Sequence, residues 1–146
     1  QLKKLREETQ AGVSDCRQAL EDAGGDMAKA KKILHAKGME KAAKKEGKET
    51  SEGIIESYVH ANGKIGVLLE LRSETDFVAR NDEFKKLAHE IAMQIAAMNP
   101  KNVKELLATA YIRDGSLTIE ALMKSTIAKV GENIQITRFI RYQLGE

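Results

Sequence analysis

Apolar residues in the middle of the chain follow two different spacings, and each spacing predicts a different element. Residues 64–71 carry an apolar side chain at every second position, the pattern of a half-buried strand: Ile65, Val67, Leu69 and Leu71. Residues 82–98 instead repeat apolar positions every three and four residues, which predicts an amphipathic helix of about four turns. This helix ends before Pro100, since proline disfavours helical geometry in the residue before it.

A second strand-like run, residues 54–61, precedes the first and is separated from it by Asn62-Gly63. This dipeptide is the strongest short signal for a two-residue hairpin turn, so the two runs are expected to pair as antiparallel strands. Further along, residues 103–107 suggest a short helix and Tyr111-Ile112 a brief strand. A turn is expected at residues 114–116.

The last third of the chain predicts a closing helix and a closing strand. Thr118 can cap a helix that Gly131 stops. Residues 133–143 then alternate as a strand with four apolar side chains on one side: Ile134, Ile136, Ile140 and Tyr142. Arg138 interrupts this face, which indicates either an interface residue or a β-bulge.

The amino-terminal residues predict three short helices. Gly12 ends the first; Ser14 or Asp15 caps the second, which stops at Gly24-Gly25; and Asp26 caps the third. Gly38 is a natural end for the third helix, with one more helical segment over residues 39–45.

The predicted elements indicate an α+β protein, with a three-helix module followed by a small antiparallel sheet packed with helices. The polar stretch 47–53 resembles a linker. We therefore expect a helical module for partner binding at residues 1–46, the linker at 47–53, and an α+β core domain at 54–146.

Composition narrows the function classes. The chain has 146 residues, of which 42% are hydrophobic and 32% charged, with a formal net charge of +2. Nucleic acid is not the expected ligand, because a phosphate-tracking surface needs concentrated positive charge. No stretch approaches the roughly 20 apolar residues of a membrane span, so a cytoplasmic protein is expected. The single cysteine, Cys16, lies on an apolar helix stripe and is expected in the core.

No pattern of catalytic or metal-ligating residues stands out. The three histidines are scattered, with no carboxylate or cysteine at metal-ligand spacing, and no phosphate-binding glycine loop is evident. We expect no enzyme activity, no metal and no cofactor.

Between the strand and the long helix lies the run Thr75-Asp76-Phe77-Val78-Ala79, followed by a basic residue. Thr75 is placed to cap a helix, and the Asp76 carboxylate suits a helix N-terminus. Taken without context, Phe77 most often closes the core over a strand end. This run, however, resembles the signature of the elongation factor Ts family.

The resemblance to this family extends over most of residues 2–98 and 110–144. Family-like blocks occur in order near the start, at residues 4–9, 11–12 and 15–20, then at 25–26 and 41–45. Residues 127–134, followed by Arg138-Phe139, resemble the closing helix and strand. The resemblance also implies a ubiquitin-associated-like fold for the three-helix module.

The resemblance implies a guanine-nucleotide exchange factor that binds elongation factor Tu and disturbs its magnesium and phosphate site. Residues Thr75, Asp76, Phe77 and Val78 would contact that site, with Phe77 as a wedge. It also places Arg6, Val13 and Ser14 on a second contact surface, for which ordinary helix surface is the alternative.

The chain departs from the family pattern in one place. Relatives carry a longer stretch between the helix at 82–98 and the closing helix, whereas about twenty residues intervene here. Short forms of the family pair, so a homodimer is a further expectation. Two other hypotheses remain open: a helical-bundle binding module without exchange activity, and an unrecognised enzyme.

Overall fold

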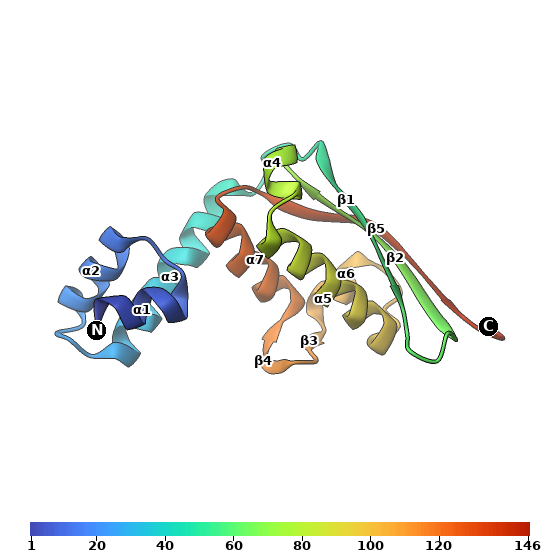
Figure 1. The fold of residues 1–146 in the computed structure, drawn as a ribbon, viewed down its shortest axis with the longest axis horizontal. Coiled ribbons are helices and arrows are strands. Elements are labelled where there is room, and N and C mark those ends of the chain that lie inside the picture. Colours follow the sequence, from blue (N-terminus) through green and yellow to red (C-terminus); the bar gives the residue numbers. More distant parts are fainter.

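Three helices make up the amino-terminal part of the protein: α1 (Leu2–Thr9), α2 (Val13–Asp22) and α3 (Met27–Lys45) (Figure 1). In the computed structural model, which describes residues 1–146, they enclose a small apolar core of their own. Its buried members are Leu5, Cys16, Ala19, Ala23, Ala30 and Leu34. The three-helix arrangement and the burial of Cys16 are confirmed, and Asp26 caps α3 by accepting hydrogen bonds from the backbone N–H groups of Ala28 and Lys29.

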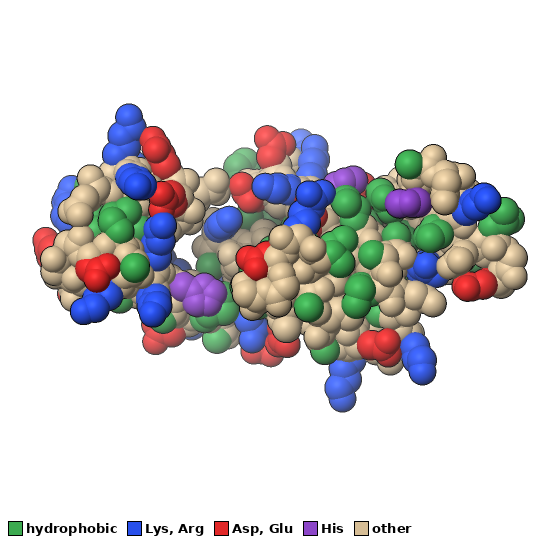
Figure 2. Space-filling view, turned by 90° about the horizontal axis from the view of Figure 1, so that it is seen from below, with side chains coloured by type: hydrophobic (Ala, Val, Ile, Leu, Met, Phe, Trp, Pro, Cys, Tyr) green, Lys and Arg blue, Asp and Glu red, His purple; other side chains and the backbone are tan.

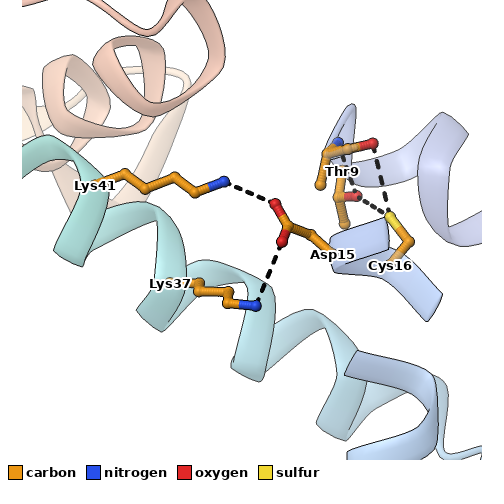
Figure 3. A network of polar contacts seen from close by, with 6 residues as sticks. Thr9, Asp15, Cys16, Lys37 and Lys41 are labelled. Atoms are coloured by element: carbon orange, nitrogen blue, oxygen red, sulfur yellow. Dashed lines mark hydrogen bonds and ion pairs between the residues drawn. The ribbon is translucent and has the colours of Figure 1, made fainter. Parts of the chain in front are cut away.

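The predicted cap of α2 is wrong. Gly12 occupies the N-cap position, and neither Ser14 nor Asp15 caps the helix. The Asp15 carboxylate turns to α3 instead, where it accepts from Lys41 Nζ at 2.7 Å and from Lys37 Nζ at 3.3 Å (Figure 3). These two lysines hold the pKa of Asp15 below its usual value. Asp15 lies inside the first turn of α2, and its carboxylate makes a tertiary ion pair with α3 and no cap.

Gly38 does not end the third helix, which runs without interruption to Lys45. The glycine lies where α3 crosses α7 (Ile119–Val130), and a Cβ atom at this position would come within 3.4 Å of the Ala128 Cβ atom. Beyond the crossing, Ala42 is buried in the main core of the protein. One helix thus contributes to both cores, and the prediction of a break at Gly38 missed this.

The main core lies between a three-stranded sheet and the helices on one of its faces. The strands β1 (Glu52–Val59), β2 (Ile65–Ser73) and β5 (Ile134–Gln143) pair antiparallel in the order β1-β2-β5. Helix α5 (Asp82–Met98) packs against β1 and β2, and its bounds match the prediction (Figure 1). The inward residues of β2 include Val67, Leu69 and Leu71, as predicted. The α+β class is confirmed, whereas the division at residues 46 and 53 stays a prediction.

The connection between β1 and β2 differs from the predicted two-residue turn. His60 N donates to Ile65 O, so four residues, 61–64, form the loop. Gly63 N donates back to His60 O, and Asn62 Oδ1 accepts from Lys64 N. Asn62 and Gly63 do lie at the centre of the turn, but the loop also includes one residue on each side of them.

A β-bulge in β5 changes which side chains face the core. Glu70 pairs with Arg138, whereas Leu71 pairs with Ile136, so Thr137 is an extra residue in β5. Before the bulge, Ile134 and Ile136 point inward and are buried. After it, Ile140 and Tyr142 point outward and are 44% and 70% exposed, so their predicted place on the same face as Ile134 is wrong. The extra residue reverses the alternation. Of the two alternatives for Arg138, the bulge is present beside it, while Arg138 itself is exposed on the outer face of the sheet and an interface role stays a prediction.

The remaining elements close the far end of the core: α6 (Val103–Ala108), β3 (Ala110–Tyr111) and β4 (Asp114–Thr118). The backbone turn lies at residues 112–113, before the expected turn at 114–116, and β4 begins at Asp114. Asp114 Oδ1 does accept a hydrogen bond from Ser116 N at 3.1 Å, the contact of an Asx-turn. Thr118 caps α7 and Gly131 ends it, as predicted. None of the helices is long and apolar enough to cross a lipid bilayer.

Candidate functional site

The segment after β2 forms a separate helical turn, α4 (Asp76–Ala79). Thr75 is its N-cap, as predicted, and its Oγ1 atom accepts from Val78 N at 3.3 Å. Ser73 Oγ donates to Thr75 O at 2.8 Å and holds the residue before the turn. A second cap, Asn81, starts α5. The strand therefore leads into a short independent turn before the long helix begins.

The side chain of Phe77 lies outside the core. It is 77% exposed, whereas Val78 and Ala79, the next two residues, are 4% and 1% exposed. Successive residues of a helix point about 100° apart, so the burial of these two smaller side chains directs Phe77 away from the core. The interpretation that Phe77 closes the core is wrong.

Asp76 is also exposed and pairs with Arg80 Nε at 3.2 Å, one turn further along the chain. The side chains of both partners are more than 60% exposed. A pair of this kind contributes little to stability because water competes for both charges. The Asp76 carboxylate can therefore leave Arg80 for another partner at little cost.

The helical turn α4 lies at one end of the sheet, away from the β1–β2 hairpin (Figure 1). It packs against β1 and β2, and the end of α3 and the start of β5 lie close by (Figure 1). The turn thus presents an aromatic ring and a carboxylate at the edge of a packed scaffold.

The amino-terminal candidates lie on a different part of the molecule. Arg6 and Val13 border one shallow depression with Leu2, while Ser14 is exposed outside it. The structure therefore brings two of the three predicted residues together, but it does not bring them to α4 (Figure 1).

A larger groove is bordered by residues 8–15 of the helical module, by α3 and by α7, and Figure 2 shows a hollow between the module, on the left, and the rest of the molecule. Charged side chains of both signs border it, including Glu8, Asp15, Lys31 and Lys129. Lys31 pairs with Glu8, just as Lys41 pairs with Asp15. Four lysines and two carboxylates line the groove, and the two carboxylates are both engaged in ion pairs with lysines.

One residue that contacts the functional segment was not singled out by its sequence pattern. Glu132, in the turn between α7 and β5, contacts Thr75, which is 57 residues away in sequence. No local periodicity or motif spacing connects residues this far apart. Its place in a family-like block, residues 127–134, was the only available signal.

Comparisons with known proteins identify the family. The model of the family described as elongation factor TS matches residues 74–146. Elongation factor Ts of Fervidobacterium nodosum is 45% identical over 190 aligned positions, which cover 99% of this chain and 96% of that protein. The same-named protein of Thermotoga petrophila is 44% identical, with 99% and 94% covered, and that of Rippkaea orientalis is 43% identical, with 100% and 77% covered.

The alignment with the Fervidobacterium protein is longer than this chain of 146 residues, so at least 44 of its positions have no counterpart here. The identity nevertheless extends over nearly the whole chain, including the helical module, which lies outside the residues that the family model matches. The chain therefore belongs to the elongation factor Ts family of translation elongation factors.

Proposed function

We propose that this protein is a guanine-nucleotide exchange factor that binds elongation factor Tu in its GDP form and accelerates GDP release in the cytoplasm, with no catalytic site of its own. The observation that supports this most is the 77% exposure of Phe77 on a turn whose neighbouring apolar side chains are buried. Family membership suggests the activity, and α4 has the features that such an activity needs.

Exchange requires that the factor and the nucleotide weaken each other's binding to the GTPase by the same ratio. The factor therefore needs contacts that the GTPase offers only when its nucleotide site is disturbed. In the proposed complex, residues 75–78 lie against the magnesium and phosphate site, and the ring of Phe77 separates partner side chains that otherwise organise the ion.

Burial of the Phe77 ring on binding can supply free energy for separating the partner side chains that organise the ion. Burying a side chain of this size contributes about 1.5–3 kcal/mol, which corresponds to roughly a 10- to 150-fold change in an equilibrium constant. Asp76 can leave its weak pair with Arg80 and compete for groups that organise the magnesium. Loss of the ion removes charge compensation from the phosphates, so GDP leaves faster.

The test is the release of labelled GDP from elongation factor Tu at controlled magnesium, with the parent and with Phe77→Ala. We expect the parent to accelerate release and the variant to lose most of that effect. Ile112→Ala is the matched control, because Ile112 is also a large exposed apolar residue, 46% exposed, on another turn. No acceleration by the parent would refute the exchange proposal, whereas equal acceleration by parent and Phe77→Ala would refute the role of the ring.

The helical module is proposed as the second contact surface, through Arg6, Val13 and Ser14. All three are exposed, and they lie away from α4, so they can add affinity without entering the nucleotide site. We expect Arg6→Ala to raise the concentration of factor that gives half-maximal exchange while leaving the maximal rate unchanged. The alternative function, a helical-bundle protein-binding module without exchange activity, predicts that residues 1–46 alone keep the main activity and that the parent leaves GDP release unchanged.

A homodimer is proposed through the outer face of the sheet, which no helix covers (Figure 1). Five apolar side chains of this face are 44–70% exposed: Ile55, Val59, Leu68, Ile140 and Tyr142. Leu68 lies opposite Ile140 in the pairing of β2 with β5. Sedimentation velocity should show a dimer that Leu68→Glu converts to a monomer and Ile112→Glu does not; a monomeric parent would refute the pairing.

A further inference from the structure

The turn between α7 and β5 directs a carboxylate at the start of the functional segment. Glu132 Oε1 accepts from the backbone N–H of Thr75 at 3.0 Å, and Glu132 Oε2 accepts from Thr75 Oγ1 at 2.7 Å. One carboxylate therefore receives both hydrogen-bond donors of the residue that caps α4. Hydrogen bonds with an ionised acceptor are stronger than those between neutral groups.

A second carboxylate makes the reverse contact. Glu74 Oε2 accepts from the backbone N–H of Asn133 at 2.6 Å. The two contacts are thus reciprocal. Glu132 accepts from the backbone N–H of Thr75, and Glu74 accepts from the backbone N–H of Asn133. Asn133 is 5% exposed, and its Nδ2 atom donates to Lys48 O at 2.8 Å, so the receiving turn is itself fixed.

The contact with Glu132 also determines how Thr75 caps α4. The Thr75 hydroxyl donates its hydrogen to Glu132, and its oxygen accepts from Val78 N. A hydroxyl rotates to suit its partners, so the carboxylate selects the orientation in which an oxygen lone pair faces the first turn of α4. Removing the carboxylate leaves this orientation undetermined.

We propose that Glu132, supported by Glu74, is a positioning residue for nucleotide exchange: it fixes the start of α4, and with it the orientation in which the outward-facing ring of Phe77 meets the partner. The inference rests on the proposed function of Phe77. A single helical turn has little stability of its own, so its shape depends on contacts at its start. Ordering the turn before binding reduces the conformational entropy lost when the complex forms.

The first test compares exchange by Glu132→Ala, Glu132→Gln and the control Glu105→Ala, whose side chain is exposed on α6. We expect Glu132→Ala to lower exchange efficiency about tenfold. Glu132→Gln should fall between it and the parent, because its one oxygen can still accept from one of the two Thr75 donors. Glu105→Ala should match the parent.

A double variant distinguishes the positioning role of Glu132 from a merely structural one. In the Phe77→Ala background, Glu132→Ala should cause a smaller loss than in the parent, since the ring, the main contact that α4 presents, is no longer there to be positioned. An equal loss in both backgrounds would overturn the inference. If the parent has no exchange activity, the proposed function is refuted. If the parent is active and Glu132→Ala is equally active, only the positioning role is refuted.

The second test needs no partner. Amide hydrogen exchange by nuclear magnetic resonance in the free protein should show a protected Thr75 N–H that exchanges about tenfold faster in Glu132→Ala, the factor that corresponds to about 1.4 kcal/mol. Glu132→Gln should retain part of the protection, and amides of α5 should be unaffected. A Thr75 amide that is equally labile in the parent and in Glu132→Ala would overturn the inference.

Discussion

Gly38 offers a sharp test of how the helical module joins the rest of the protein. The glycine lies inside α3, and its backbone does not adopt the left-handed conformation that favours glycine. A Cβ atom there would lie 3.4 Å from the Ala128 Cβ atom, a distance of ordinary contact. An alanine should therefore fit, while a larger side chain should force the two helices apart.

The expected magnitudes follow from helix propensity and packing. Alanine is more favourable than glycine inside a helix by about 1 kcal/mol, so Gly38→Ala should stabilise the protein by up to that amount. In a chain of this size this corresponds to a rise of about 3 °C in Tm. Gly38→Leu places three more carbon atoms in the helix crossing than Gly38→Ala does. Overpacking of this kind costs about 1–3 kcal/mol of stability.

The measurement is thermal unfolding followed by circular dichroism, with a check that the transition is two-state. Combining Gly38→Leu with Ala128→Gly should recover part of the lost stability, because the second change makes room at the same contact. Two results would refute the reasoning. Gly38→Ala could prove destabilising, as expected for a glycine that ends a helix, or Gly38→Leu could prove as stable as Gly38→Ala.

Three further predictions concern single groups. Hydrogen bonds from two lysines lower the folded-state pKa of Asp15. Its contribution to stability is therefore present above the unfolded pKa of about 3.9 and is lost as the pH falls through the folded pKa. The difference in Tm between the parent and Asp15→Asn should accordingly shrink on acidification. Burial and a hydrogen bond to a carboxylate raise the pKa of Tyr111 to about 12. Its contribution to stability is therefore lost as the pH rises from about 10 to about 12. Tyrosinate absorbance should show one group that titrates at a higher pH than the other tyrosines and that is absent in Tyr111→Phe. A Cβ atom at Gly53, where φ is 147°, would lie 2.1 Å from Leu71 O, so Gly53→Ala should lower Tm strongly while Gly115→Ala, with open space around it, should change Tm little; equal effects would contradict the predicted clash.

The sequence alone determined the features that depend on neighbouring residues. The helix at residues 82–98, the caps Asp26, Thr75 and Thr118, and the stop at Gly131 all match the structure. Capping and periodicity act within a few residues, so a local pattern contains the information needed to predict them. The run at residues 75–80 indicated the family through its resemblance to a known signature, which is likewise contained in neighbouring residues.

The tertiary structure alone decided four features that bear on function: the exposure of Phe77, the continuity of α3 through Gly38, the bulge at Thr137 and the reach of Glu132 to Thr75. Each depends on a contact between segments that are distant in sequence. Val78 and Ala79 direct Phe77 outward only because a core lies beneath them, and Gly38 can continue a helix or end one until α7 packs against it. Local preferences leave such alternatives close in free energy, and packing between distant segments selects one of them.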